Sequence, residues 1–506
     1  MPEGIVYLIG AGPGDPGLLT LKGRALIEEA DVVVYDYLAN PRLLDFARKD
    51  AEVIYVGKMG GAHTMTQENI NSLLVEKCRA GKSVARLKGG DPFIFGRGGE
   101  EAEELIKAGL RYEVVPGVTA AVAASAYSGI PLTHRDFTAT VAFVTGHEDP
   151  TKEESNIHWD KLATGIGTLV FFMGVKNLPN IVDNLTKNGR AASTPVAVIR
   201  WGTTPEQKTV TGTLADIVEK VAKAGIKPPA LTVVGDVVSL KPTLDWFEKK
   251  PLFGRKIVVT RAREQASVFA DRLKKSGADV IEFPTIETKQ PDSWDSLDAA
   301  IERLPQFDWV IFTSVNGVRY FLQRLKERGS DIRELKGPQI CAIGPKTAEA
   351  IENLGVRVAA VPSEYRAEAI LGALGGENLK GKNILIPRAK VAREVLPEEL
   401  VKLGANVTVA EAYETVKPAA LKDEMVKLFS ENRVDAVTFT SSSTVSNFMD
   451  MFGKEEAVRL MNGVKVASIG PITSDTARKF GLEPSIEPKD YTTEALAVAL
   501  ESYYSK

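Results

Sequence analysis

Hydrophobic and polar positions follow two alternating rhythms along this chain. Short Val- and Ile-rich runs predict strands, and they begin at Ile5 and recur at 32–35, 53–56, 83–87, 141–145, 169–173, 196–200 and 231–234. Between them lie longer stretches with apolar residues at helical spacing, such as the acidic stretch 100–107. Strands that alternate with helices specify α/β layers, and we expect mostly parallel strands.

The alternation weakens around residues 241–254, a segment with Pro, Lys and several aromatic residues. Segments of this composition commonly separate domains. We therefore predict a first module at 1–245, a linker at 246–254 and a second module at 255–506. The aromatic residues of the linker would allow it to be clipped onto one neighbour.

The second module contains an internal repeat. Arg261 in Thr-Arg-Ala matches Arg388 in Pro-Arg-Ala, and 388 minus 261 gives an offset of 127 residues. Further pairs share an offset of 127 or 126: Gly277 with Gly404, Thr288 with Thr415, Phe312 with Phe439, Ala342 with Ser468 and Tyr365 with Tyr491. A repeat of this length is a whole doubly wound lobe. We predict a pair of flavodoxin-like lobes with a ligand cleft between them, but the sequence leaves open whether the copies exchange strands.

Size and composition narrow the class of protein. At 506 residues the chain should divide into two to four domains, and its net charge of -3 argues against nucleic acid as the main partner. Cys78 and Cys341 lie far apart and are expected to be buried free thiols, and the spacing of the four histidines argues against a protein-held metal. With no membrane-length apolar run and no signal peptide, we expect a cytoplasmic protein that does not enter a membrane.

The stretch 86–100 carries much of the candidate chemistry. It combines several glycines with Asp91 and with flanking Arg and Lys residues. Glycine weakens helices and strands, and this cost is accepted mostly where the backbone approaches a ligand or adopts positive φ. We interpret the stretch as a ligand-binding loop. A long surface turn, with Asp91 as a turn former ahead of proline, is the alternative.

A second glycine loop follows the first predicted strand. Gly10, Gly12 and Gly14 suggest a dinucleotide-binding fingerprint, but Asp15 stands where the third glycine is expected, and Pro13 removes an amide donor. A carboxylate at this position would repel a pyrophosphate. The loop better suits a ligand without phosphates, such as S-adenosylmethionine with its sulfonium cation.

Asp36 keeps another interpretation open. It follows the second predicted strand, where a dinucleotide enzyme carries its ribose-binding acid. A nicotinamide-dependent oxidoreductase is therefore the alternative function for the first module. For Asp36 itself, an exposed loop aspartate is the simplest alternative.

The order of motifs in the first module is more specific than either loop. The motifs are Val-Tyr-Leu-Ile-Gly-Ala-Gly-Pro-Gly-Asp-Pro, Arg-Leu-Lys-Gly-Gly-Asp-Pro-Phe-Ile-Phe-Gly-Arg, Val-Val-Pro-Gly-Val-Thr-Ala, Phe-Phe-Met-Gly, Trp-Gly-Thr-Thr-Pro and Pro-Pro-Ala-Leu-Thr-Val-Val-Gly. With this series, residues 4–247 resemble uroporphyrinogen-III C-methyltransferase, which converts uroporphyrinogen III to precorrin-2 with S-adenosylmethionine. The resemblance implies two α/β lobes, at about 1–117 and 118–245, over a deep trough, and a homodimer.

The resemblance also implies roles for individual residues. The methyl-donor pocket would be lined by Pro13, Gly89, Gly90, Asp91, Ile94, Thr119, Ala120, Met173, Gly202 and Ala230. Asp36 is the candidate base that removes a proton from the macrocycle, and Lys58 occupies a position implicated in the same family. Tyr37 and Met59 stand where many relatives carry cations, which affects the substrate contacts and not the methyl-donor site.

The substrate is rich in carboxylates, and cations of the same module are available to meet them. The candidates are Arg86, Lys88, Arg97, Arg135 and Arg200. Solvated surface charge is the alternative for each of them.

The motifs of the second module are weak singly but occur in both copies of the repeat. Thr-Arg-Ala, Phe-Thr-Ser and Ile-Gly-Pro each place a predicted strand end before a helix start, where amides and hydroxyls favour anions. Arg261, Ser314 and Ser441 are therefore candidates for binding a polycarboxylate on two facing rims. Simple N-capping explains the serines equally well.

By the order of these motifs, residues 253–506 resemble uroporphyrinogen-III synthase, which cyclises hydroxymethylbilane while inverting ring D. The resemblance implies that the copies interleave, with 255–288 and 416–506 in lobe A and 289–412 in lobe B. It also implies that Tyr413 helps to expel the hydroxyl group of the substrate. A packed linker aromatic is the alternative for Tyr413.

The two resemblances support each other, because the product of the second module is the substrate of the first. They predict a bifunctional enzyme that takes hydroxymethylbilane through uroporphyrinogen III to precorrin-2, for sirohaem or corrinoid synthesis. S-adenosylmethionine would be the methyl donor, without a metal. For the second module, a non-catalytic sensor of small anions is the alternative.

Overall fold

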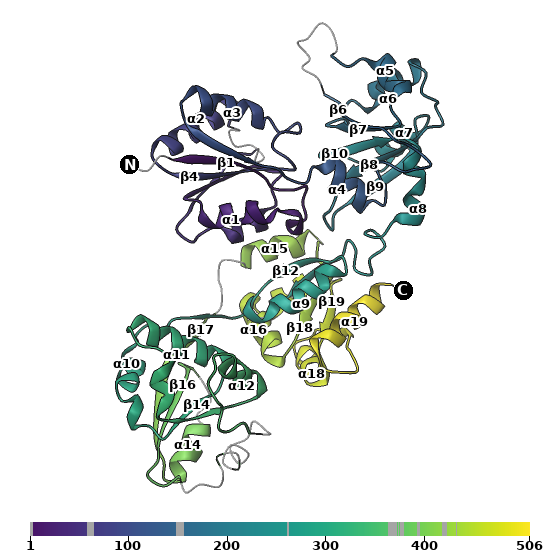
Figure 1. Cartoon of the computed structure of the whole chain (residues 1–506). Helices are drawn as coiled ribbons and strands as arrows, with labels where there is room; N and C mark the ends of the chain where they lie inside the picture. Colours follow the sequence, from purple (N-terminus) through teal and green to yellow (C-terminus); the bar gives the residue numbers. More distant parts are fainter. Residues whose placement is uncertain are drawn as a thin grey trace. The chain divides into compact units, whose positions relative to one another are not determined.

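The computed structural model describes residues 4–57, 65–147, 156–260, 263–362, 372, 374, 379–391, 395–416, 422–431 and 433–505, without the side chains of 263–267. Within these ranges the strands form four five-stranded sheets (Figure 1). The chain divides into two compact units. One comprises Met1–Lys256, Asp271–Val280 and Leu500–Lys506, and the other Ile257–Ala270 and Ile281–Ala499.

The first sheet is parallel throughout, as predicted. Its strands lie in the order β3 (Glu52–Tyr55), β2 (Val32–Tyr35), β4 (Ser83–Lys88), β1 (Ile5–Gly10) and β5 (Arg111–Val115). Three helices accompany it: α1 (Leu21–Glu29), α2 (Gln67–Arg79) and α3 (Gly98–Lys107). The helices α1 and α2 begin at Thr20 and Thr66, whose side chains accept hydrogen bonds from backbone amides of the first turn.

Helices cover both faces of this sheet, because successive side chains of a strand point to opposite faces. Val32 and Val34 of β2 pack in a core with residues of α2 and α3. Val33 packs in a separate core with Ile27 of α1. The first lobe is therefore doubly wound.

The second sheet corrects our expectation of mostly parallel strands. Its order is β6 (Val141–Thr145), β7 (Thr168–Phe172), β10 (Ala230–Val234), β8 (Pro195–Arg200) and β9 (Lys208–Thr213). Only β6 and β7 run parallel, whereas β10 is antiparallel to both β7 and β8, and β8 is antiparallel to β9. A run of apolar residues indicates that a strand is buried on both faces, but it does not indicate the direction of the strand.

Helices also cover both faces of the second sheet. Ala121 and Ala124 of α4 (Ala120–Tyr127) pack in the core on one face. The other core contains residues of α5 (Trp159–Gly165), α6 (Leu178–Lys187) and α7 (Ile217–Lys223). The small side chains of α4 allow its backbone to lie close to the sheet.

The two remaining sheets contain the internal repeat. The third has the order β12 (Asp279–Glu282), β11 (Lys256–Val259), β18 (Ala436–Phe439), β19 (Lys465–Ser468) and β20 (Pro484–Ile486). The fourth has the order β13 (Glu287–Lys289), β17 (Asn406–Val416), β16 (Asn383–Ala389), β14 (Trp309–Phe312) and β15 (Gln339–Ala342). Their helices are α9 (Arg263–Lys275), α10 (Asp295–Glu302), α11 (Val315–Glu327), α12 (Pro345–Glu352), α14 (Val395–Lys402), α15 (Lys422–Ser430), α16 (Ser442–Phe452), α17 (Lys454–Leu460), α18 (Pro471–Lys479) and α19 (Thr493–Tyr504).

The strand positions show that the copies of the repeat exchange strands. β11, β12 and β14 begin 127 residues before β16, β17 and β18, respectively, and β15 begins 126 residues before β19. The third sheet takes β11 and β12 from the first copy but β18, β19 and β20 from the second. The fourth takes β14 and β15 from the first copy and β16 and β17 from the second. When the strands are numbered within each copy of the repeat, both sheets have the flavodoxin-like order 2-1-3-4-5. In the fourth sheet the parallel bridge of Cys341 to Ala360 supplies the fifth position, and β13 lies outside this series at the other edge.

Two short segments at the predicted lobe boundaries pair with the other sheet. The boundaries elsewhere stay a prediction. β13 is antiparallel to β17, so Glu287 and Thr288 lie in the fourth sheet, although we had assigned them to lobe A. The last residues of β17, up to Val416, lie in the same sheet beyond the predicted end of lobe B.

Further expectations concern cysteines and membranes. Cys78 in α2 and Cys341 in β15 are both buried and free, as predicted. In the described part of the chain, every helix is too short or too polar to cross a membrane.

Candidate active sites

The candidate methyl-donor residues of the first lobe follow strands that end at one edge of the sheet. Pro13 follows β1, Asp36 follows β2, and the corner Gly89–Asp91 follows β4. Because β2, β4 and β1 are adjacent and parallel, their carboxyl ends bring these residues together. Open α/β sheets bind ligands in this place.

Three backbone segments cross closely at this edge. The Gly90 amide donates to the Gly12 carbonyl over 2.8 Å, and the Gly12 amide donates to the Gly90 carbonyl over 3.2 Å. A Cβ atom on Gly117 would lie 2.2 Å from the Gly90 oxygen and 2.6 Å from the Gly10 Cα. Only glycine permits this approach, so the glycines of both loops build one corner.

Asp91 fixes the shape of that corner. Its Oδ1 accepts a hydrogen bond from the Phe93 amide over 2.8 Å, and its Oδ2 accepts one from the Gly117 amide over 2.9 Å. The turn-forming alternative for Asp91 is therefore correct. Its direct contact with a ligand stays a prediction.

The second lobe contributes one edge of its own sheet. Met173 follows β7, Gly202 follows β8, and Ala230 begins β10, which is antiparallel to both strands. These three residues therefore lie at the same edge. Thr119, which is buried, and Ala120 stand at the start of α4 beside the glycine corner, where a Cβ atom on Gly90 would lie 3.7 Å from the Thr119 Cα and from the Ala120 amide nitrogen.

Backbone strain is concentrated in the loops of this site. Within the described ranges, the non-glycine residues with positive φ are Phe95, Arg97, Met173, Trp201 and Thr203. All of them lie in the loops that follow β4, β7 and β8. Such conformations cost about 1–3 kcal/mol each and persist where the surroundings hold them, which is typical of ligand sites.

Side chains of the two lobes meet across the site. Phe95 packs against Phe172 with ring centroids 5.0 Å apart, which brings the loop of Ile94 next to the end of β7. Tyr37 and Trp201 form a second pair with centroids 5.7 Å apart. Tyr37 thus makes an aromatic contact between the lobes.

Asp36 belongs to a compact cluster of four charged side chains. Glu101 is completely buried, and its Oε1 lies 2.6 Å from Lys88 Nζ and 3.3 Å from Arg86 Nε. Arg86 Nη2 lies 3.2 Å from Asp36 Oδ2. Burial, and then the neighbouring charge of Arg86, lower the pKa of Lys88.

The cluster changes the interpretation of two predicted substrate cations. Arg86 and Lys88 are 3% and 4% exposed, so they are not solvated surface charges. Their charges are balanced by Asp36 and Glu101, and in this arrangement they face those carboxylates. A direct contact of Arg86 or Lys88 with substrate stays a prediction that would require the cluster to open.

The remaining predicted cations are placed differently. Arg97 is exposed at the start of α3 and forms an ion pair with Glu100, with Nη2 and Oε2 2.6 Å apart. Arg135 is exposed, and Arg200 at the end of β8 has a buried Nε without a hydrogen-bond partner. Lys58 and Arg261 lie outside the described residues.

The first site fits S-adenosylmethionine better than a dinucleotide. Asp15 Oδ1 accepts a hydrogen bond from the Gly17 amide over 2.8 Å. This amide is therefore not free to donate to a pyrophosphate. Asp15 and Asp91 provide negative charge, whereas the buried cations Arg86 and Lys88 are already paired. Carboxylates and a glycine corner suit a sulfonium cation whose adenosine and amino acid ends must approach backbone.

In the second module, Tyr413 and Ser314 come together. Ser314 caps α11, its Oγ accepting the Gly317 amide over 3.0 Å, and lies 3.1 Å from the Tyr413 hydroxyl oxygen. Tyr413 in β17 is 8% exposed and stacks on Tyr320 with ring centroids 5.6 Å apart. The N-capping alternative for Ser314 is correct, and the serine also holds the hydroxyl of Tyr413.

Ser441 occupies the corresponding position in the other lobe. It caps α16 in a capping box with Thr444, as the alternative interpretation proposed. Beyond Tyr413, Lys390 Nζ lies 2.6 Å from Glu414 Oε1 and 3.0 Å from Asp292 Oδ2. Hydrogen bonds from Lys390 and then Lys289 lower the pKa of Asp292 to about 2. The two lysines of this cluster therefore balance the charges of its two carboxylates, Asp292 and Glu414.

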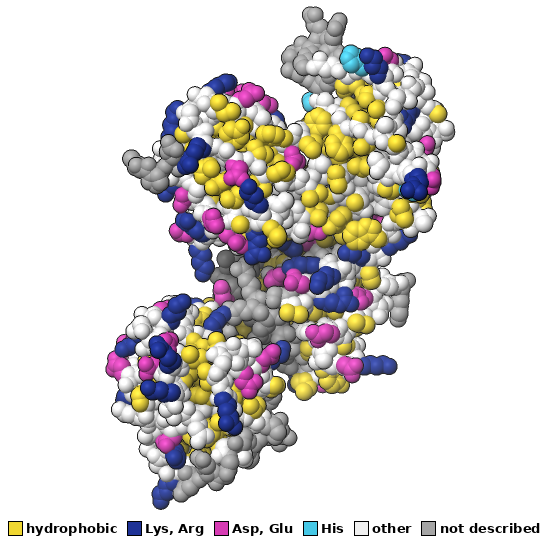
Figure 2. All heavy atoms as spheres, viewed as in Figure 1, with side chains coloured by type: hydrophobic (Ala, Val, Ile, Leu, Met, Phe, Trp, Pro, Cys, Tyr) yellow, Lys and Arg dark blue, Asp and Glu magenta, His cyan; other side chains and the backbone are white. Residues whose placement is uncertain are grey.

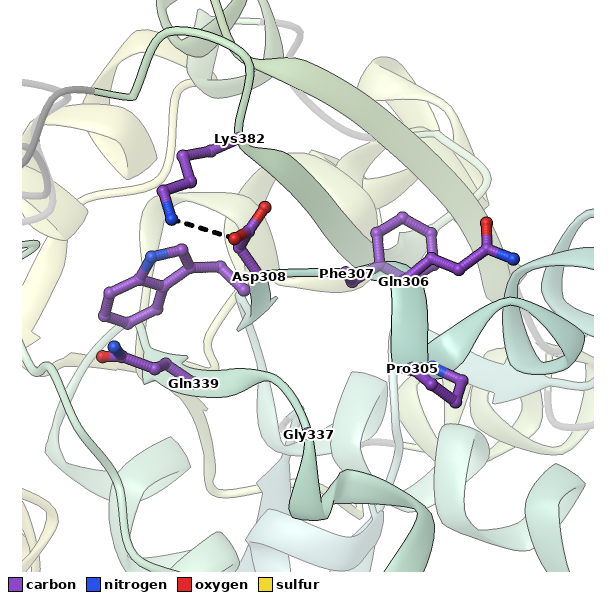
Figure 3. A pocket seen from close by; sticks show the side chains of 8 residues that line it. Pro305, Gln306, Phe307, Asp308, Gly337, Gln339 and Lys382 are labelled. Carbon is purple, nitrogen blue, oxygen red and sulfur yellow. Dashed lines mark hydrogen bonds and ion pairs between the residues drawn. The ribbon is translucent and has the colours of Figure 1, made fainter.

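A cavity of about 360 Å³ lies at the opposite edge of the fourth sheet (Figure 3). It is lined by Pro305, Gln306, Phe307, Asp308, Trp309, Gly337, Gln339 and Lys382. These residues precede or begin β14, β15 and β16, whereas Ser314 and Tyr413 lie at the carboxyl ends of their strands. Lys382 and Asp308 form an ion pair of 2.9 Å in it.

Sequence reasoning missed three residues that shape the first site. Thr203 lies inside the Trp-Gly-Thr-Thr-Pro motif and could have been found there. Tyr127 ends the Ala-rich helix α4, and Glu101 is one of several glutamates in α3, so neither carries a distinguishing local signal. Within the described ranges, no group of three His, Cys, Asp or Glu residues could hold a metal ion.

Comparisons with known proteins found matches to both modules. A family model described as Tetrapyrrole (Corrin/Porphyrin) Methylases matches residues 5–218, and one described as Uroporphyrinogen-III synthase HemD matches residues 267–497. A uroporphyrinogen-III C-methyltransferase of Bacillus subtilis is 45% identical over 373 residues, which is 74% of this chain and 76% of the relative. The porphyrin biosynthesis protein HemD of Ruminiclostridium josui is 36% identical over 503 residues, which is 99% of this chain and 98% of the relative.

Among solved structures, the uroporphyrin-III C-methyl transferase of Thermus thermophilus complexed with S-adenyl homocysteine is similar to the first module. It is 41% identical, with 46% of this chain and 99% of that chain covered and a TM-score of 0.40. The folds, the sites and the family models together define a tetrapyrrole methylase joined to a uroporphyrinogen-III synthase module. The chain belongs to the uroporphyrinogen-III C-methyltransferase family. The oxidoreductase interpretation of the first module is not supported.

Proposed function

We propose that this chain catalyses two consecutive steps of tetrapyrrole synthesis. The second module closes hydroxymethylbilane to uroporphyrinogen III with inversion of ring D, and the first module methylates this product twice to give precorrin-2. The observation that carries the first activity is the glycine corner of Gly10, Gly90 and Gly117, with carboxylates and strained loops around it. The observation that carries the second is the pair of Tyr413 in β17 and Ser314, which follows β14 and caps α11.

In the methylase, bound S-adenosylmethionine supplies a methyl group on a sulfonium. We assign the pocket to Pro13, Gly89, Gly90, Asp91, Ile94, Thr119, Ala120, Met173, Gly202 and Ala230, as the resemblance implies. The glycine corner admits close approach of backbone, and apolar walls such as Met173, with 54% of its surface exposed, align the reacting centres. Positive charge disappears from sulfur during transfer, so alignment matters more here than a strong acid.

Asp36 is our candidate for the base that takes a proton from the methylated macrocycle. Its Oδ2 is held by Arg86 Nη2, and its Oδ1 accepts the Leu38 amide over 3.0 Å, which fixes the carboxylate at the mouth of the site. Its side chain is 26% exposed, so it remains accessible to substrate. Lys58, Arg97, Arg135 and Arg200 remain our candidates for further catalytic or carboxylate contacts.

In the synthase, the Tyr413 hydroxyl is our candidate for the group that protonates the departing hydroxyl of hydroxymethylbilane, which leaves as water. Ser314 orients the Tyr413 hydroxyl. The two lobes hold the linear substrate so that ring D reacts at its substituted carbon. Arg261 and Ser441 are proposed to bind substrate carboxylates at the other lobe.

Two finer statements accompany the proposal. We propose that the enzyme is cytoplasmic, where its small-molecule substrates are made. We also propose a homodimer, because Figure 2 shows hydrophobic side chains gathered over both lobes of the methylase module, and exposed apolar patches commonly mark interfaces.

One incubation tests both activities. Purified chain is mixed with hydroxymethylbilane and S-adenosylmethionine carrying a labelled methyl group, and the products are analysed by mass and by isomer. We expect a dimethylated type III product. Uroporphyrinogen I alone would leave the anion-sensor interpretation of the second module standing, and unmethylated type III product would contradict the methylase assignment.

Changing Tyr413 to phenylalanine should reduce the rate of uroporphyrinogen III formation about tenfold or more, because the proton donor is lost while the ring still stacks on Tyr320. The measurement is the ratio of type III to spontaneous type I product. Tyr320→Phe is the matched control, because it removes a hydroxyl that donates to the Thr288 carbonyl in the same stack. Equal losses in both variants would assign Tyr413 to packing.

A further inference from the structure

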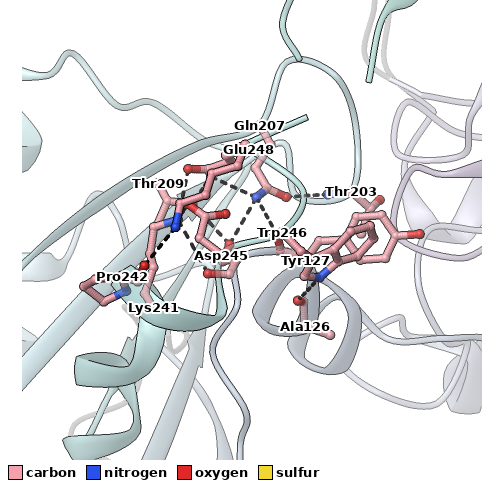
Figure 4. Close-up of polar contacts among 12 residues, drawn as sticks. Ala126, Tyr127, Thr203, Gln207, Thr209, Lys241, Pro242, Asp245, Trp246 and Glu248 are labelled. Atoms are coloured by element: carbon pink, nitrogen blue, oxygen red, sulfur yellow. Dashed lines mark hydrogen bonds and ion pairs between the residues drawn. The ribbon is translucent and has the colours of Figure 1, made fainter. Parts of the chain in front are cut away.

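The segment that leads out of the methylase is packed against it. Residues 241–244 form α8 (Lys241–Leu244), and beyond it Phe247 and Leu252 are 6% and 0% exposed. Trp246 Nε1 donates to the Ala126 carbonyl over 3.0 Å (Figure 4). Trp246 and Phe247 of the predicted linker therefore pack on the methylase, whereas the Leu252 amide donates to the Ser276 carbonyl.

Tyr127 connects this segment with the glycine loop. Its ring packs against both Trp246 and Phe247, with centroid distances of 5.0 and 4.7 Å. Its hydroxyl donates to Asp15 Oδ2 over 2.8 Å. Burial, and then the hydrogen bond to Asp15, raise the pKa of Tyr127, so the hydroxyl stays a donor at all physiological pH values.

A second route reaches Asp15 from the same segment. Glu248 Oε1 accepts from Gln207 Nε2 over 2.9 Å, and Glu248 Oε2 pairs with Lys241 at 3.0 Å. Gln207 Oε1 in turn accepts the Thr203 amide over 2.8 Å (Figure 4). Thr203 Oγ1 accepts the Asp15 amide over 3.0 Å.

Both routes end at Asp15, and the second route passes through a residue in a costly backbone conformation. Thr203 has a φ of 73°, which non-glycine residues rarely adopt, whereas Gly12 and Gly14 adopt φ values of 75° and 149° without the penalty of a Cβ atom. Strained backbone of this kind persists only where surrounding contacts over-determine it. Here the contacts hold the amide of Asp15 through one route and its carboxylate through the other.

We propose that residues 241–253 are a positioning clamp for the methyl-donor loop, acting through Tyr127 and Gln207 on Asp15. The clamp keeps the loop of Gly10–Asp15 in its binding conformation and joins it to the second lobe. It predicts that the methylase needs this segment for affinity toward its methyl donor and not for the chemical step. This inference rests on the proposed methylase function.

Binding of S-adenosylhomocysteine to the full chain, measured by calorimetry, tests the clamp. Tyr127→Phe removes the hydroxyl but keeps the ring, and Glu248→Gln removes the charge at the other route. Each should weaken binding about tenfold, because Tyr127→Phe breaks a hydrogen bond to a charged carboxylate, and Glu248→Gln removes the charge that strengthens the Gln207 hydrogen bond and the pair with Lys241. Glu219→Gln, at an exposed position of α7 outside the clamp, should bind as the wild type does.

Steady-state kinetics separate positioning from folding. In both variants we expect KM for S-adenosylmethionine to rise about tenfold with kcat within about twofold, because only the loop is loosened. Trp246→Phe, which keeps an aromatic ring, should bind more tightly than Trp246→Ala. Wild-type affinity in both Tyr127→Phe and Glu248→Gln would overturn the clamp. Absence of binding by the wild type would overturn the methylase proposal instead.

Discussion

Changing Asp36 to asparagine is expected to slow formation of precorrin-2 by ~10²–10⁴-fold, the usual contribution of a positioned general base. Asparagine has the size of aspartate, and its Oδ1 can still accept the Leu38 amide, whereas its Nδ2 replaces the oxygen that accepts from Arg86. The variant should therefore fold and bind S-adenosylhomocysteine normally, and lose only proton removal. The measurement is the rate of methylation of uroporphyrinogen III at saturating methyl donor.

Two controls make this experiment decisive. Asp45→Asn changes an exposed aspartate of the same lobe and should leave the methylation rate unchanged. The synthase activity of Asp36→Asn should equal that of the wild type, because Tyr413 and Ser314 lie in the other module. A methylation rate close to wild type in Asp36→Asn would remove Asp36 from the mechanism.

Changing Glu101 to glutamine should destabilise the methylase module by about 3–5 kcal/mol, because two buried cations then lose their shared carboxylate. Glu101 is fully buried, and the ammonium of Lys88 and the guanidinium of Arg86 both point at its Oε1. Glutamine has nearly the same volume, so cavity formation does not contribute. The measurement is the shift of the methylase transition in urea unfolding.

The same helix provides a matched control. Glu104 of α3 forms an exposed ion pair with Lys107, and Glu104→Gln should change stability by less than about 1 kcal/mol. Adding Lys88→Met to Glu101→Gln should recover part of the loss, because one of the unpaired cations is removed. Equal stability of Glu101→Gln and Glu104→Gln would show that the cluster is not held by this carboxylate.

Much of the fold could be predicted from local pattern. The run 32–35 of buried-type residues became β2 at the predicted positions, and the offset between Arg261 and Arg388 marked the repeat. Strand direction could not be predicted for β10, because a strand covered on both faces shows the same apolar run in either direction. The exchange of strands was hidden from the local pattern, because both copies carry the same series of strands and either assignment satisfies it, and only the resemblance to uroporphyrinogen-III synthase implied that the copies interleave.

The sites were predictable in part through the resemblance. It implied Pro13, Gly90 and Met173 as pocket residues, and each of them follows a strand at an edge of its sheet. The charges of Arg86 and Lys88 were visible, but their burial beside Glu101 depends on how α3 packs on β4, which no local spacing reports.

The exchanged strands also set the order in which this chain can be completed on the ribosome. Ile257 of β11 pairs with Ala436 of β18, and 436 minus 257 leaves 179 residues still to be translated when β11 emerges. At ~5–20 residues per second this wait lasts about 10 to 35 seconds. The methylase module can therefore mature during synthesis, whereas in the third sheet β11 has only β12 beside it until β18 is translated, a period in which a nascent-chain chaperone would find an exposed strand edge to bind.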